Sequence, residues 1–164
     1  MSSKMGVVQE FIEQSAYSNR FSGVEAGTDE FNKIWRDIAS NHPKEFRSAQ
    51  HDYIKKTHYN IQINSILSRC GFPIHNKNAA LNDLVWSTGV QFGPRTKLIE
   101  KAIKDLDISS ASIIEIIGAV QDYKISNNAR LFASSPTLQP GLLARAKDEK
   151  RKLLELEMTD YEIE

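Results

Sequence analysis

The most informative stretch of the chain reads AALNDLVWSTGVQFGP, from Ala79 to Pro94. Residues at helical spacing form one mainly apolar face, made by Leu81, Leu84, Val85, Thr88 and Phe92. A different face gathers Asn82, Trp86, Ser87 and Gln91. The closing Gly-Pro predicts a sharp helix stop, because glycine accepts positive φ and proline cannot continue a helix. We therefore expect a rigid helix whose second face is suited to a polar, ring-shaped ligand such as a sugar.

Trp86 also has a simpler interpretation. Aromatic side chains carry the largest apolar area of all residues and often fill hydrophobic cores. On this interpretation Trp86 packs inside the protein, and the face that carries it binds no ligand. The residues alone leave both interpretations open.

Composition indicates an ordinary globular protein. The chain has 164 residues, of which 40% are hydrophobic and 26% charged, and this length suits one domain with a core. Acidic and basic residues balance at 21 each, so no overall charge favours nucleic acid or an anionic membrane. A single cysteine, Cys70, excludes an internal disulfide and a four-cysteine zinc site.

Helix signals recur along the rest of the chain. Ser2 or Ser3 and then Thr28 suit helix N-caps, and Pro43 suits a first helical position. Further helices are expected from Asn60 to Gly71, from Thr96, from Ser109 or Ser110, and after the break at Pro140-Gly141. The predicted fold class is all-α, or mainly α with a small irregular corner, as a single-domain helical bundle. This domain spans residues 1–155, and an acidic tail follows at residues 156–164.

The residues indicate no metal site, cofactor or catalytic nucleophile. The histidines are His42, His51, His58 and His75, and the pair at 51 and 58 lies ~10 Å apart along a helix, too far for one metal ion. No phosphate loop, dinucleotide fingerprint or serine-nucleophile motif is present. Paired carboxylates remain open for acid–base catalysis, with Glu25, Asp29 and Asp52 as candidates, although exposed carboxylates usually have no such role.

Three segments in register extend this interpretation. They are residues 50–59 (QHDYIKKTHY), residues 80–94, and QDYK at 121–124 leading to GLLARA at 141–146. In this order they resemble the C-terminal helical part of phage-associated and secretion-associated peptidoglycan hydrolases. More distantly they are similar to the secretion-activator and phage muramidase branch of the lysozyme superfamily. The resemblance covers most of residues 28–155 and implies a lysozyme-like glycoside hydrolase that degrades cell walls.

The start of the chain departs from that family. Its members begin with a glutamate-bearing helix and a short strand, whereas Met1 to Gly6 here resembles the segment after them. The general acid is therefore expected to be missing. General acid catalysis is typically worth roughly 10²–10⁴-fold in rate, so the chain alone is expected to be catalytically incomplete.

The resemblance assigns roles to six residues. His51, Trp86, Ser87 and Gln91 would bind glycan strands of peptidoglycan, and Glu25 or Asp52 would act as the auxiliary carboxylate. A structural, hydrogen-bonded role for His51 stays equally open. The alternative is a non-enzymatic phage or secretion-system protein, structural or interacting, on the same scaffold.

The remaining expectations concern partners and location. A nucleic-acid partner is not expected, because Asp148 and Glu149 interrupt the basic residues around them. Without about 18 continuous apolar residues or a signal peptide, the chain is expected to be made in the cytoplasm and not to enter the membrane. Action in the periplasm or cell wall would need another delivery route, as part of a longer hydrolase or of a phage or secretion component.

Overall fold

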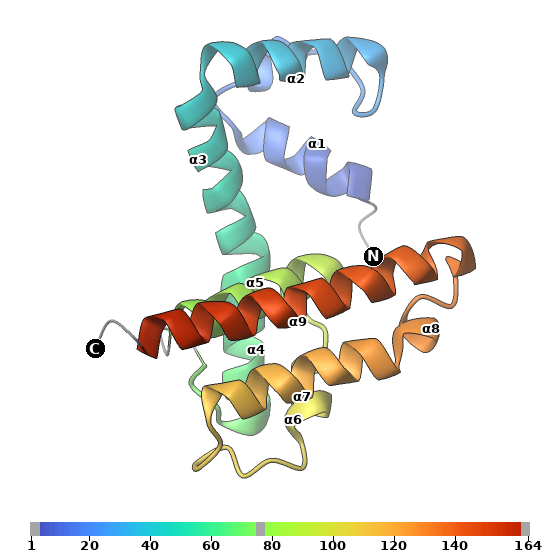
Figure 1. The fold of residues 1–164 in the computed structure, drawn as a ribbon. Helices are drawn as coiled ribbons and strands as arrows, with labels where there is room; N and C mark the ends of the chain where they lie inside the picture. Colours follow the sequence, from blue (N-terminus) through green and yellow to red (C-terminus); the bar gives the residue numbers. More distant parts are fainter. Residues whose placement is uncertain (1–3, 75–77, 162–164) are drawn as a thin grey trace. The chain divides into compact units, whose positions relative to one another are not determined.

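The computed structural model describes residues 4–74 and 78–161 (Figure 1). Every regular element in these ranges is helical, and no strand occurs within them, which confirms the predicted all-α class. The chain divides into two compact units, residues 1–56 and 57–164. The proposed caps Ser2 and Ser3, and also His75, lie outside the described residues.

The described part of the first unit contains three α-helices and a short 3₁₀-helix. Their bounds are α1 (Lys4–Gln14), η1 (Ser18–Phe21), α2 (Asp29–Asn41) and α3 (Pro43–Ile54). The predicted starts of α2 and α3 are confirmed. The Thr28 hydroxyl accepts a hydrogen bond from the Phe31 backbone N–H at 3.2 Å, and Pro43 occupies the first turn of α3.

Aromatic side chains build the core of this unit. Phe46 on α3 is 1% exposed, and its ring lies 4.8 Å from that of Trp35 on α2, measured between centroids. The Phe11 ring of α1 lies 6.0 Å from Phe46 and 5.9 Å from Trp35. Edge-to-face packing of this kind joins all three helices around one cluster.

The second unit contains the stretch from Ala79 to Pro94. It also contains the larger of the two hydrophobic clusters, which includes Leu84 and Ile117. A five-residue π-helix, η2 (Lys55–Tyr59), leads into it. Its other elements are α4 (Asn60–Cys70), α5 (Ala79–Phe92), α6 (Leu98–Ile103), α7 (Ile113–Ser126), α8 (Asn128–Leu131), η3 (Pro136–Leu138) and α9 (Gln139–Tyr161). The long α9 packs along both α7 and α5 (Figure 1).

Helix α5 has the predicted form. The Asn78 side chain caps it by accepting a hydrogen bond from Leu81 N–H at 2.8 Å, and Gly93 ends it with φ of 95°. Leu81, Leu84 and Val85 are at most 1% exposed, so the apolar face is the buried one. The end of α4 at Gly71, with φ of 68°, is confirmed as well.

Three helix starts differ from the prediction. Helix α6 begins at Leu98 and not at Thr96, whose hydroxyl accepts a hydrogen bond from the Leu98 backbone N–H at 3.3 Å. Ser109 and Ser110 hydrogen-bond the Asp107 carboxylate instead of capping α7. Ser112 caps α7 instead, in a reciprocal capping box with Glu115 that satisfies the backbone N–H groups of both residues. Helix α9 includes Pro140 in its first turn, where the missing N–H of proline is tolerated.

Helix α9 continues into the segment that was expected to be an acidic tail. Residues 156–161 are helical, and Glu157 is only 2% exposed. The Asn78 side-chain amide donates a hydrogen bond to the Glu157 carboxylate, which ties the end of α9 to the start of α5. The boundaries predicted for a single domain and a tail stay a prediction.

A buried ion pair joins α7 to α9. The Lys124 side chain is 2% exposed, and its Nζ lies 3.7 Å from Oε1 of Glu149. Burial lowers the pKa of Lys124 to about 8, and the nearby Glu149 carboxylate only partly opposes this shift. Neither charged group has a hydrogen-bond partner among the described residues. The ammonium also lies 6.0 Å from the centroid of the Phe92 ring.

The two units should unfold separately when one core is weakened. We expect Phe46→Ala to destabilise the first unit by about 3–5 kcal/mol, because it leaves a cavity among aromatic rings. Each unit holds one tryptophan, Trp35 and Trp86, so fluorescence reports on either unit in a Trp86→Phe or Trp35→Phe background. The urea midpoint reported by Trp35 should fall, while that reported by Trp86 should hold. Equal shifts would show one cooperative domain, and exposed Lys44→Ala is the control.

The Lys124–Glu149 pair gives a second stability prediction. Lys124→Met leaves the Glu149 carboxylate buried without its cation and should cost on the order of 3 kcal/mol at neutral pH. Lys124→Met with Glu149→Leu should recover most of this loss, because both charges are then gone. Urea unfolding measures both effects, and a double variant no more stable than the single one would refute the explanation.

The pH dependence of this pair has a definite sign. The unfolded chain binds the Lys124 proton more strongly than the folded one, since the pKa falls from 10.5 to about 8 on folding. The stability of the wild type should therefore rise relative to the double variant between pH 8 and 10.5. A relative fall over that interval would contradict the buried-cation geometry.

Candidate functional site

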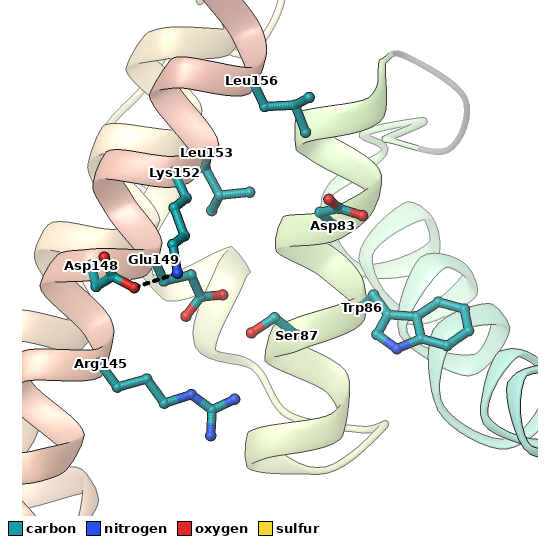
Figure 2. Close-up of a pocket in the computed structure, with 9 residues that line it drawn as sticks. All are labelled: Asp83, Trp86, Ser87, Arg145, Asp148, Glu149, Lys152, Leu153 and Leu156. Carbon is teal, nitrogen blue, oxygen red and sulfur yellow. Dashed lines mark ion pairs between the residues drawn. The ribbon is translucent and has the colours of Figure 1, made fainter. Parts of the chain in front are cut away.

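A pocket of about 670 Å³ lies between α5 and α9, within the second unit (Figure 2). Its α5 wall holds Asp83, Trp86 and Ser87. Its α9 wall holds Arg145, Asp148, Glu149, Lys152, Leu153 and Leu156. Residues four apart lie on the same helix face, so each wall follows from helical spacing.

The side chains differ in how they face this pocket. Ser87 points from α5 toward α9, and Arg145 points back toward α5, whereas the exposed Asp83 carboxylate does not extend toward α9 (Figure 2). The indole of Trp86 turns away from them and packs on Tyr59, with 5.5 Å between ring centroids. Trp86 is half-buried, so it is neither sealed in the core nor presented as an open stacking face.

Several charges around the pocket are already paired. Asp148 lies 2.7 Å from the Lys152 ammonium and 2.8 Å from the Arg151 guanidinium. Glu149 forms the buried pair with Lys124 described above. Asp83, Ser87 and Arg145 differ from these residues, because their side chains make no hydrogen bond or ion pair within residues 4–74 and 78–161. Desolvation raises the pKa of the Asp83 carboxyl, as expected for a carboxylate without a cation.

The six residues predicted for a site divide between the two units. Trp86 and Ser87 line the α5–α9 pocket, whereas Gln91 lies one turn farther along α5 and does not. His51 and Asp52 are neighbours on α3, with 59% and 73% of their side chains exposed, and 3.5 Å separates Nδ1 from Oδ1. Glu25 is exposed and lines a second pocket of about 450 Å³ in the first unit. The ligand-binding and catalytic roles assigned to these residues stay predictions.

Sequence reasoning missed the α9 side of the pocket. Arg145, Glu149 and Lys152 recur at helical spacing, so the sequence does place them on one helix face. Such a pattern of charges usually marks a helix face in contact with solvent, so it did not indicate a pocket wall. No group of three or more metal-ligating side chains occurs among the residues described. Within the same ranges, no helix is both long and apolar enough to cross a membrane.

Comparison with known proteins found a matching family and a relative. The family model described as "Type VI secretion system spike protein VgrG3-like, C-terminal" matches residues 1–150. The type VI secretion system spike protein VgrG3 of Vibrio cholerae serotype O1 is 48% identical over 164 residues, which is the whole chain. The chain spans 16% of the length of that relative.

These matches correct the family predicted from the sequence. Both descriptions refer to a type VI spike protein, and neither names a hydrolase, a lysozyme or peptidoglycan. They overturn the assignment to lysozyme-like hydrolases, together with the glycosidase activity, the cell-wall degradation and the peptidoglycan partner inferred from it. The alternative, a structural or interacting secretion-system protein, fits them better. The physical reason is that helical spacing is shared by many families and does not identify an activity.

Two observations show the family. The family model matches residues 1–150 of the chain, and the relative is similar to the whole of this chain. The chain belongs to the family of VgrG3-like C-terminal domains of type VI secretion system spike proteins.

Proposed function

We propose that this chain is a C-terminal module of a type VI spike protein and acts by association with other components of that secretion system. The observation that carries the proposal is the 48% identity to a spike protein over the entire chain. Because the chain spans 16% of that relative, the role proposed is that of a module within a longer assembly component.

The structure is compatible with such a role. Each unit has its own hydrophobic cluster, the first around Phe46 and the second around Leu84 and Ile117. A module with a core of its own keeps its fold when it is carried at the end of another domain. The 21 acidic and 21 basic residues balance, so no net charge favours a nucleic-acid partner.

Export is the second part of the proposal. A spike module is expected to leave the cell with the secretion apparatus, which would provide the delivery route that the sequence called for. On this proposal the chain needs no signal peptide, because the apparatus carries it as one of its parts.

Secretion is the direct test. The protein is expressed from its own gene in cells with an active type VI system, and antibodies to residues 1–164 quantify it in medium and cells. We expect the module in the medium, and its loss from the medium when sheath contraction is blocked. A cytoplasmic enzyme measured in the same samples controls for lysis. Equal release from contracting and blocked cells would contradict export through this system.

Association is tested separately. Crosslinking in the same cells, followed by purification of the module, should recover the tube or spike components of the system. The exposed variant Lys44→Ala should behave like the wild type, whereas Phe46→Ala, which destabilises the first unit, should weaken the crosslinks. Recovery of no secretion-system component from contracting cells would refute the proposed role.

A further inference from the structure

Two polar side chains of α7 are buried in the core of the second unit. Gln121 is 0% exposed and Lys124 is 2% exposed. They stand three residues apart in the same helix, so they are neighbours on one face. Helix α9 packs along α7 and places Glu149 next to Lys124 (Figure 1).

These three residues leave much of their hydrogen-bonding capacity unused. Within residues 4–74 and 78–161, the oxygen and nitrogen of the Gln121 amide have no hydrogen-bond partner, and neither do Nζ of Lys124 and the two carboxylate oxygens of Glu149. The 3.7 Å between Nζ of Lys124 and Oε1 of Glu149 is longer than a hydrogen bond. Buried polar groups are almost always hydrogen-bonded, to protein or to ordered water, because an unmade bond costs free energy. The arrangement therefore requires a further donor and acceptor.

We propose that a water molecule is bound between α7 and α9, where Lys124, Glu149 and Gln121 share it. The water accepts a hydrogen bond from the Lys124 ammonium and donates one to the Glu149 carboxylate, so it bridges the 3.7 Å between the two charged groups. Its remaining hydrogen bond goes to the Gln121 amide. Internal waters typically make about three hydrogen bonds to buried polar groups, which matches these three side chains.

Water fits this set of groups better than an ion does. A cation would be repelled by Lys124, and an anion would be repelled by Glu149. The groups also differ in what they need, because an ammonium only donates hydrogen bonds and a carboxylate only accepts them. Water both donates and accepts, carries no charge and occupies little volume.

Oxygen-17 relaxation dispersion of water in a solution of the full chain tests the proposal. The method responds to water oxygens that stay inside the protein for longer than the protein takes to tumble, and exchanging side-chain protons do not contribute. We expect a dispersion step in the wild type. The step should be smaller by the contribution of one water in Lys124→Met with Glu149→Leu, a variant whose helical fold is checked by circular dichroism. No step in the wild type, or an unchanged step in the double variant, would overturn the proposal.

A second variant keeps the charged pair and removes only the third partner. Leucine fills a volume similar to that of glutamine without hydrogen-bonding groups, so in Gln121→Leu the water should leave about fivefold sooner. The dispersion should then move to higher frequency by that factor. Asp122→Ala is the matched control, because it removes a more exposed ion pair, of 2.6 Å to Lys150, between the same two helices. It should keep the wild-type dispersion. No change in Gln121→Leu, or an equal change in the control, would contradict the assigned site.

Discussion

The packing of α9 against α7 and α5 determines the structure of the second unit. Leu153 and Ala146 of α9 are buried at 5% and 6% exposure, so the helix contributes directly to the core. Helix α9 also makes two polar contacts with other helices. Glu149 pairs with Lys124 of α7, and Glu157 accepts a hydrogen bond from Asn78 at the start of α5. The same placement brings the α9 wall opposite α5 and so creates the pocket.

The buried pair restricts how these helices can pack. A shift of α9 by one turn along α7 would leave Lys124 without an anion in a site that is almost fully dehydrated. An unpaired buried charge costs several kcal/mol, so alternative registers are strongly disfavoured. Because the desolvation of the pair is expensive, we expect the pair to contribute more to the choice of a single register than to stability. The position of Arg145 opposite Ser87 follows from that register.

Local sequence signals predicted many of the helix starts and ends. The burial of charged side chains by distant helices could not be predicted from such signals. Thr28, Pro43, Gly71 and Gly93 each act within one turn of their own helix, so their roles could be identified from neighbours in the sequence. The burial of Lys124 and Glu157 depends on helices far away in the chain, and such residues are normally exposed.

The candidate site was predicted only in part, for a related reason. Trp86 and Ser87 of the predicted face both line the pocket, but the opposite wall comes from a segment about sixty residues later. The direction of the indole depends on Tyr59, which no local pattern reveals. The family assignment was overturned because similar helical motifs occur in proteins with different roles.

The most direct test is a measurement of the Lys124 side chain itself. Nuclear magnetic resonance of chains with ¹³C- and ¹⁵N-labelled lysine follows each ammonium group through a pH titration, and Lys124→Arg identifies the signal. Burial between α7 and α9 predicts a pKa of about 8 for Lys124, well below that of the exposed lysines. A pKa near the ordinary value of 10.5 would place Lys124 in water and contradict the packing on which the pocket depends.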